Sequence, residues 1–205
     1  IVIVLADHGD GMGSHRMVTK QVSFYEEMTN VPFIIAGPGI HPRQKPVEDL
    51  LTQPTIDLLP TLCELAGIPV PSSKPGISLA PFLKGEKQKR QHPYAASEWH
   101  SEYEVTVSPG RMIRSPRYKY THYLEGNGEE LYDMLKDKGE RRNLAHDPKY
   151  SKILAEHRAL LDDYIRRTQD DYRSLKVEAD KRWRSHAPGY PNHEGPCARD
   201  IINRK

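Results

Sequence analysis

The hydrophobic positions of the first 90 residues gather in short continuous runs. Residues 1–6 (IVIVLA) form one run, and residues 31–36 (VPFIIA) form a second. A continuous run rich in β-branched residues is typical of a strand that is buried on both faces, as at the centre of a parallel sheet. With a short helix predicted over residues 22–29, the two strands would form a β-loop-α-β unit.

A helix is predicted over residues 58–66, where leucines recur with the spacing of one helical face. Gly67 follows at the position where glycine commonly ends a helix. Pro60 suits this helix only in its first turn, because proline lacks the N–H group that later turns donate. We therefore expect the helix to begin near Asp57.

Residues 111–133 show a different pattern, one that is typical of antiparallel strands. An Asn-Gly pair at residues 127–128 is a strong signal for a tight turn between two strands. Tyr118 and Tyr120 alternate with Lys119, and successive side chains of a strand point to opposite faces. The pattern predicts a sheet with one buried face and one solvated face, and it places Lys119 on the solvated face.

The sheet is predicted to be covered by a helix that ends at about Thr168. Asp147 followed by Pro148 is typical of a helix start. Apolar residues at helical spacing over 153–165 would form the buried stripe of that helix. The remaining residues are polar and contain several prolines, so we expect them to wrap the surface or to be partly disordered.

Composition limits the classes of partner. The 205 residues include 30 Lys and Arg against 28 Asp and Glu, which gives a net charge of +2. This balance provides no field of one sign to attract nucleic acid or an acidic membrane. No apolar run approaches the ~18 residues of a membrane span. We therefore expect neither a nucleic-acid partner nor a membrane span.

Candidate chemistry is concentrated where the first predicted strand ends. Asp7 and His8 follow this strand directly and are surrounded by glycines. In open α/β sheets, ligands bind beyond the carboxyl ends of strands, and these two side chains could hold a metal ion there. Lys20 would add a cation for an anionic substrate. A plain turn rich in Asp and Gly, with Lys20 as a solvated surface charge, explains the same residues.

Short motifs continue along the first 168 residues. They are residues 6–10 (ADHGD), 13–15 (GSH), Lys20, 25–27 (YEE), 31–32 (VP), 37–40 (GPGI), 57–62 (DLLPTL), 64–68 (ELAGI), 76–79 (GISL), 117–120 (RYKY), 130–133 (ELYD) and 143–145 (NLA). In order and spacing they resemble the second half of a type I sulfatase of the alkaline phosphatase superfamily.

The resemblance implies an α/β fold with three regions. Residues 1–90 would be the C-terminal part of an alkaline-phosphatase-like α/β/α sandwich. Residues 91–168 would form a small α+β subdomain, an antiparallel sheet with a terminal helix. Residues 169–205 would be a polar C-terminal extension. The charged stretch that ends at Pro93 is typical of such a boundary.

The resemblance also implies site residues. Family members hold a divalent cation, usually Ca²⁺, with two acidic residues of an N-terminal segment and a later pair that matches Asp7 and His8. An imidazole ligand keeps Zn²⁺ open as an alternative, and Mg²⁺ is another. Lys20 matches the lysine that contacts the sulfate group, and His15 is a second catalytic candidate that would face the substrate.

The sequence departs from the family at the nucleophile. Family members use a formylglycine made from the Cys or Ser of a Cys/Ser-x-Pro-x-Arg motif, and neither Cys63 nor Cys197 has this context. We expect the nucleophile, the other metal ligands and most of the sheet to lie in a missing N-terminal part of the same enzyme. The chain would then be an inactive C-terminal fragment.

The expected function is hydrolysis of a sulfuric ester, with a sulfated sugar, another sulfated glycan or an aryl sulfate as substrate. Glu98, Trp99, His100 and Arg111 lie where they could contact a sugar. Two other classes stay open: a phosphodiesterase or phosphonate hydrolase of the same superfamily, and a non-catalytic binding or structural domain. Since similar calcium-dependent sulfatases are exported, a periplasmic, extracellular or lysosomal location is expected.

Overall fold

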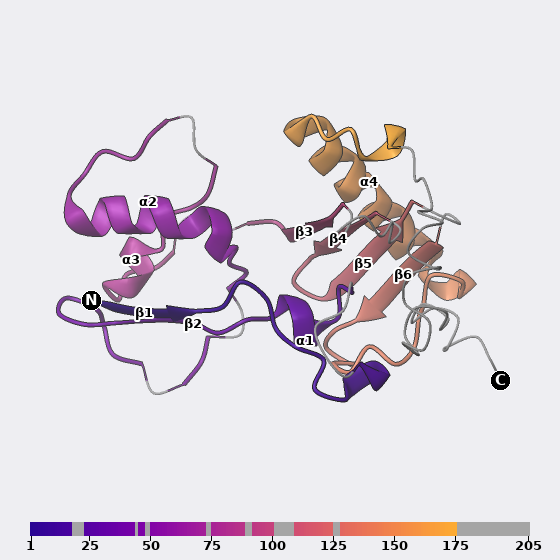
Figure 1. Ribbon diagram of the computed structural model, residues 1–205, viewed down its shortest axis with the longest axis horizontal. Helices are drawn as coiled ribbons and strands as arrows, with labels where there is room; N and C mark the ends of the chain where they lie inside the picture. The colour runs from indigo at the N-terminus through magenta and orange to yellow at the C-terminus, as the bar shows by residue number, and fades with distance from the viewer. Residues whose placement is uncertain are drawn as a thin grey trace, which may run out of the picture.

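The computed structural model describes residues 1–17, 23–43, 45–47, 50–72, 75–88, 92–100, 109–124 and 128–175. Two groups of elements lie side by side (Figure 1). One group contains β1 (Val2–Leu5), β2 (Phe33–Ala36), α2 (Pro54–Ala66) and α3 (Ala80–Leu83). The other contains a four-stranded sheet and α4 (Ser151–Thr168). Among the described helices, none combines the length and the apolar composition that crossing a membrane requires.

The first two strands pair differently from the sequence-based expectation. β1 and β2 are antiparallel, with Val2 opposite Ala36 and Leu5 opposite Phe33. The prediction that residues 1–6 are buried on both faces of a parallel sheet is wrong for this structure, since Val2 is 66% exposed and Val4 50%. Within the described residues, no third strand pairs with this ribbon. The apolar composition of β1 is typical of a strand that is covered by other segments on both faces. The described residues do not provide these segments.

Two helices near these strands also differ in extent from the predictions. The helix expected over 22–29 is a single turn, α1 (Glu26–Thr29). α2 ends as predicted, with Gly67 in the left-handed conformation at φ 68°. It begins at Pro54 rather than near Asp57, because the backbone N–H of Gln53 donates to the Asp57 carboxylate at 2.7 Å and proline suits the first helical position.

The early start of α2 places Pro60 in the second turn, where it cannot donate to the carbonyl of Ile56. Gly76 packs directly against this carbonyl. It adopts a φ of +112°, and a Cβ atom at this position would lie 2.1 Å from the Ile56 oxygen. The segment before α3 can therefore approach α2 this closely only with glycine at this position.

Gly76→Ala is expected to lower the free energy of unfolding by about 1–3 kcal/mol, because the new methyl group overlaps a backbone oxygen and the φ value disfavours alanine. Thermal unfolding of the purified protein measures the effect. Gly139→Ala is the matched control, since its nearest neighbour would lie at an ordinary 3.5 Å. Equal unfolding midpoints for the two variants would contradict the prediction.

The second group confirms the predicted sheet and terminal helix. The strands β3 (Ala95–Trp99), β4 (Gly110–Arg114), β5 (Tyr118–Tyr123) and β6 (Gly128–Asp133) follow one another in this order, and each pair is antiparallel. Of the predicted turn pair at residues 127–128, residue 127 lies outside the described residues, and Gly128 begins β6.

The start of α4 also agrees with the sequence. The Asp147 carboxylate accepts a hydrogen bond from the backbone N–H of Lys149 at 3.1 Å, and Pro148 opens the short helix η3 (Pro148–Tyr150). α4 then covers one face of the sheet (Figure 1). The predicted apolar stripe packs there against the side chains of Tyr94, Ile113, Tyr120 and Leu131.

The opposite face of the sheet is buried as well, which the sequence analysis did not predict. The segment that leads into α1 packs there, and its Tyr25 and Met28 form a second core with Tyr132 and Met134. Lys119 lies on this face and is only 1% exposed. Its placement on a solvated face is therefore wrong: the alternation was interpreted correctly, but a segment far away in sequence covers the face.

The chain returns to the sheet after α4. The guanidinium of Arg111 makes two hydrogen bonds to the Asp170 carboxylate, at 2.6 and 2.9 Å, and lies over the ring of the fully buried Tyr172. These hydrogen bonds lower the pKa of Asp170. Tyr172 begins η4 (Tyr172–Ser174). The expected extension therefore starts with residues that belong to the core, and residues 176–205 lie outside the described part of the chain.

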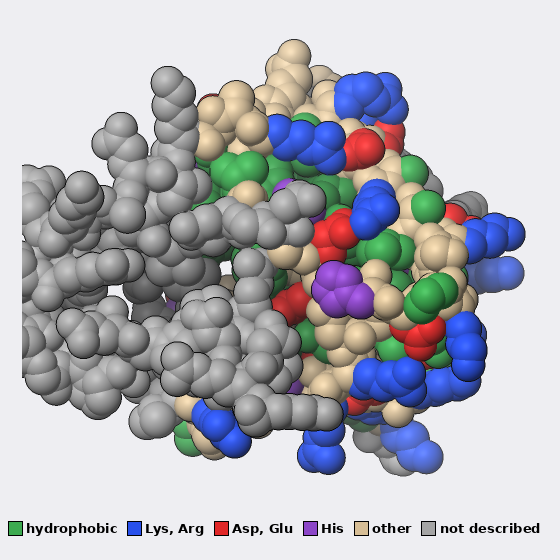
Figure 2. Space-filling model, turned by 90° about the vertical axis from the view of Figure 1, so that its right-hand side faces the viewer, with side chains coloured by type: hydrophobic (Ala, Val, Ile, Leu, Met, Phe, Trp, Pro, Cys, Tyr) green, Lys and Arg blue, Asp and Glu red, His purple; other side chains and the backbone are tan. Residues whose placement is uncertain are grey.

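The surface of the four-stranded part carries charges of both signs. On the described part of the face in Figure 2, basic and acidic side chains are interspersed with hydrophobic ones rather than gathered by sign. Ion pairs join charges of opposite sign in this part of the chain, among them Arg158 with Glu129. The arrangement agrees with the near balance of charge along the chain.

Candidate functional site

The loop that follows β1 carries the first two candidate residues, Asp7 and His8. Asp7 Oδ1 accepts the backbone N–H of His8 at 3.0 Å, and the two side chains approach to 3.7 Å between Asp7 Oδ2 and His8 Nε2. The Asp7 side chain is 89% exposed. The structure therefore places both predicted metal ligands together at the open end of a strand.

The imidazole of His8 is oriented by its neighbour. His8 Nδ1 lies 2.7 Å from the carbonyl oxygen of Gly9, and a carbonyl can only accept, so Nδ1 carries the proton. In the neutral ring, Nε2 then has the lone pair with which histidine binds metals. One carboxylate and one imidazole fit part of a metal site, and further ligands would have to come from elsewhere.

This loop is fixed against α1. The backbone N–H of Gly9 donates to the carbonyl of Met28 at 2.9 Å. A Cβ atom at Gly9 would lie 1.8 Å from the carbonyl oxygen of Glu27, so this approach needs glycine. The position of Asp7 and His8 thus depends on the position of α1.

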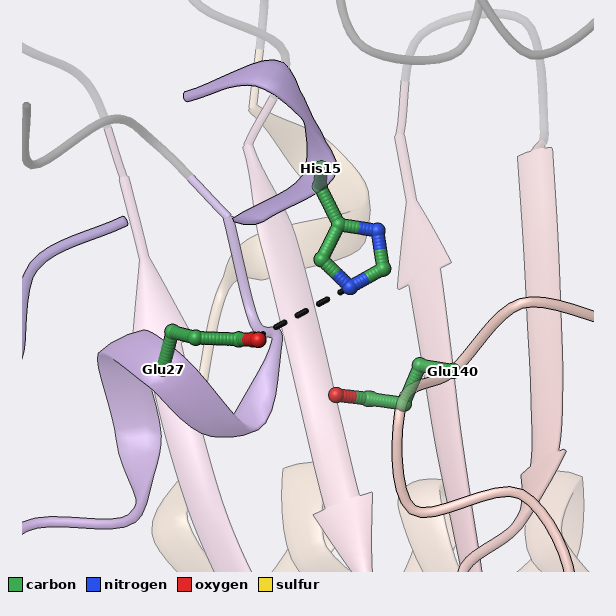
Figure 3. A group of neighbouring side chains, drawn as sticks. All are labelled: His15, Glu27 and Glu140. Atoms are coloured by element: carbon green, nitrogen blue, oxygen red, sulfur yellow. Dashed lines mark ion pairs between the residues drawn. The ribbon is translucent and has the colours of Figure 1, made fainter. Parts of the chain in front are cut away.

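His15 lies in η1 (Ser14–Arg16) and is held by the same helix. Its ring stacks on the ring of Tyr25, with centroids 3.7 Å apart and planes within 3° of parallel. Its Nε2 lies 3.9 Å from a carboxylate oxygen of Glu27 (Figure 3). The contacts of His15 are thus with α1 and the residue before it, and they fix the direction of the imidazole.

Glu140 completes a cluster with His15 and Glu27. It lies on the loop after β6, and one donor atom from each of the three residues falls within 4.8 Å of the others. Their side chains point toward one another (Figure 3). Glu140 is 2% exposed, and burial raises the pKa of its carboxyl while the ammonium of Lys119 opposes that rise.

A metal ion is not the best explanation of this cluster. The ammonium of Lys119 lies 2.9 Å from Glu140 Oε1 and 2.6 Å from Glu26 Oε1. The ammonium of Lys119 therefore already compensates the charge of Glu140. It would also repel a metal cation bound beside that carboxylate. We interpret the cluster as support for the loop that contains His15.

The remaining candidates from the sequence lie outside this arrangement. Lys20 and Cys197 fall outside the described residues. Cys63 is half-buried within α2, in a sequence context that does not fit formylglycine formation. Glu98 accepts a hydrogen bond from the Tyr164 hydroxyl, and Arg111 binds Asp170, so two of the four predicted sugar contacts have partners within the subdomain.

Sequence reasoning missed Lys119 and Glu140, which contact one another and the start of α1 beside His15. The backbone N–H of Glu26 donates to Glu140 Oε2 at 2.7 Å, although the two residues are 114 positions apart. No local spacing can reveal such a contact. A lysine between two tyrosines of a strand was the one available signal, and it was interpreted as solvated.

Comparison with known proteins identifies the family of the chain. Residues 13–167 match the family described as N-sulphoglucosamine sulphohydrolase, C-terminal. The chain belongs to this sulfatase family. The sulfatase chain is 76% identical over all 205 residues to the Delta 4,5-hexuronate-2-O-sulfatase of Bacteroides thetaiotaomicron and covers 43% of that protein.

Solved structures give the same assignment. The sulfatase chain resembles the structure of a 2-O GAG sulfatase with a TM-score of 0.87 at 76% identity, over 98% of this chain and 43% of that one. It resembles the phosphonate monoester hydrolase of Silicibacter pomeroyi with a TM-score of 0.70 at 26% identity, over 84% of this chain and 36% of that one. The chain therefore spans less than half the length of these relatives.

Membership of the family confirms the resemblance found in the sequence, including the alkaline-phosphatase-like α/β fold. Sulfatases in general use a metal ion and a formylglycine. In the sulfatase chain, Asp7 and His8 fit a part of such a metal site by their donor atoms and exposure. Neither cysteine lies in the sequence context that formylglycine requires, so the chain does not fit that group.

Proposed function

We propose that the protein to which this chain belongs hydrolyses a sulfuric ester on a sulfated sugar, specifically the 2-O-sulfate of a Δ4,5-unsaturated hexuronate. The identity of 76% over every position of the chain to a Delta 4,5-hexuronate-2-O-sulfatase supports this proposal most strongly. The aligned region spans all 205 residues and therefore includes the loop after β1 and the four-stranded sheet.

The proposed roles of the residues follow from their chemistry. Asp7 and His8 ligate a divalent cation, and the carboxylate favours Ca²⁺, since hard cations prefer oxygen. When bound, the cation withdraws negative charge from the sulfate oxygens. Lys20 contacts the sulfate group with its permanent positive charge. His15, in the loop between these residues, is the second substrate-facing candidate, with its ring direction set by Tyr25 and Glu27.

The remaining part of the same enzyme is the proposed partner of this chain. It would supply the nucleophile, the other metal ligands and neighbours for β1 and β2. A periplasmic, extracellular or lysosomal location is proposed by analogy with exported sulfatases. The three-part division at residues 90 and 168 also remains a proposal.

Sulfate release by the full-length protein from a 2-O-sulfated Δ4,5-hexuronate disaccharide tests the function. The matched substrate is the same disaccharide with its sulfate on the amino sugar instead. We expect release from the first substrate only. Release from neither sulfated disaccharide, at any divalent cation tested, would reject the proposal.

A phosphonate monoester hydrolase is the second candidate, because the fold resembles one at a TM-score of 0.70. An aryl phosphonate monoester serves as its substrate in the same assay. Cleavage of the phosphonate with higher kcat/KM than the sulfated disaccharide would favour the second candidate over the first.

Lys20→Ala in the full-length protein is expected to lower kcat/KM at least about tenfold, or roughly 1.4 kcal/mol of transition-state stabilisation. The reason is the loss of a fixed positive charge beside the sulfate group. Lys152→Ala is the control, because Lys152 is exposed on α4. Similar kinetics for the two variants would mean that Lys20 is a surface charge.

A further inference from the structure

We propose that Lys119, together with Glu140, is a positioning residue that fixes α1 and thereby the loop of the candidate site. The inference rests on the proposed function only for its effect on turnover. Its structural part concerns the order of residues 7–17 and can be tested without a substrate.

Three oxygen atoms lie around the ammonium of Lys119. It lies 2.8 Å from the carbonyl oxygen of Phe24, 2.6 Å from Glu26 Oε1 and 2.9 Å from Glu140 Oε1. The carbonyl accepts a hydrogen bond from the ammonium, and the two carboxylates form ion pairs with it at the start of α1. Because Lys119 belongs to β5, which lies between two other strands, its side chain ties α1 to the interior of the sheet.

Glu140 combines an unusual backbone conformation with contacts to both Lys119 and α1. Its backbone adopts a φ of +48°, a left-handed conformation that is rare for residues other than glycine. Its carboxylate accepts the backbone N–H of Glu26 at 2.7 Å while contacting Lys119. Its Oε1 finds no well-directed hydrogen bond within the described residues, so the Lys119 charge is its main compensation. Backbone strain that surrounding contacts maintain is typical of residues with a specific role.

The fixed helix reaches both parts of the site loop. Its Met28 accepts the N–H of Gly9, next to Asp7 and His8. Its Glu27 faces His15, and Tyr25 stacks on the same imidazole. A displacement of α1 would therefore move the candidate metal ligands and His15 together.

The charges explain why the ammonium is needed. Three carboxylates, those of Glu26, Glu27 and Glu140, gather here, and the second cation, Arg114, is 3.8 Å from Glu26. Without Lys119, the buried carboxylate of Glu140 would lose its closest positive charge. An uncompensated buried charge is costly, and the start of α1 would have to move or admit water.

The experiment compares Lys119→Met with Leu131→Ala in the full-length protein. Leu131 is fully buried on the opposite face of the sheet, in the core with α4, so its replacement destabilises the sheet without touching α1. Hydrogen–deuterium exchange and kinetics are measured at a temperature where both variants are folded. Wild-type protein is the reference.

In Lys119→Met we expect faster amide exchange over residues 9–17 and a loss of kcat/KM of about tenfold or more, because small displacements of reacting groups are costly. In Leu131→Ala we expect exchange over residues 9–17 and kcat/KM near the wild-type values. Unchanged exchange over residues 9–17 in folded Lys119→Met would overturn the inference, as would equal changes in both variants. If wild-type protein shows no sulfatase activity, the proposed function fails, and the exchange data alone still decide the inference.

Glu140→Gln provides a second variant in case Lys119→Met does not fold. The amide retains an acceptor for the N–H of Glu26 but removes the charge beside Lys119. We expect the same two changes at smaller size, and exchange identical to wild type would overturn the inference. When Lys119→Met and Glu140→Gln are combined, the fold-loss of kcat/KM should be smaller than the product of the two single losses. The reason is that the two residues act through one contact.

Discussion

Asp7→Ala in the full-length protein is expected to lower both the metal content and kcat by about 100-fold or more, since it removes a charged ligand rather than an indirect one. The Asp7 side chain is 89% exposed, so its loss should leave the fold intact. His8 would then be the one candidate donor left from this loop. Metal analysis of the purified variant and sulfate release measure the two effects.

The matched control for this prediction is Asp10→Asn in the same exposed loop, where the acceptor of the Met12 N–H is retained. It should keep metal and activity. His8→Ala distinguishes the ions: the effect should be smaller than that of Asp7→Ala for calcium and comparable for zinc, which prefers nitrogen ligands. Wild-type metal content and rate in Asp7→Ala would exclude Asp7 from the site.

Asp57→Ala is expected to destabilise the protein by about 3–5 kcal/mol, because it removes a buried carboxylate and leaves its partners, one of them a buried N–H group, without an acceptor. The carboxylate is fully buried. It accepts the backbone N–H groups of Gln53 at 2.7 Å and Ile77 at 2.8 Å, and it lies 2.7 Å from His92 Nε2. One side chain thus joins the start of α2, the segment before α3 and the residues that lead into β3.

Urea unfolding of the full-length protein, followed by circular dichroism, measures the effect of Asp57→Ala. Asp162→Ala is the control, because Asp162 is 55% exposed on α4 and pairs with Arg173, and such surface pairs contribute at most about 1 kcal/mol. A change for Asp57→Ala as small as that of the control would show that water or a rearranged loop replaces the carboxylate.

The antiparallel sheet and α4 could be predicted because their signals are local. Alternating residues, a turn pair and an Asp-Pro helix start each specify the conformation of neighbouring residues. The pairing of β1 could not be predicted in the same way. A continuous apolar run indicates a strand with two buried faces, but it does not identify which segments pair with it or cover it.

The candidate site shows the same limit. Asp7 and His8 were found because they directly follow a strand, and the structure places them together there. The contacts of His15 with Tyr25 and Glu27 were not predicted from the sequence, although Tyr25 and Glu27 belong to the recognised motif at residues 25–27. Lys119 was misplaced because alternation along a strand shows which residues share a face, whereas the covering segment is about a hundred residues away.

The return of the chain onto the sheet after α4 affects how this region can be exchanged between relatives. The family match ends at residue 167, yet Arg111 depends on Asp170 and Tyr172 for its charge partner and its cover. A chimera joined at the family boundary would lack the Asp170 carboxylate that pairs with the buried guanidinium of Arg111, and weakening the compensation of a buried charge is costly. The unit that can be transplanted from this chain therefore extends through η4.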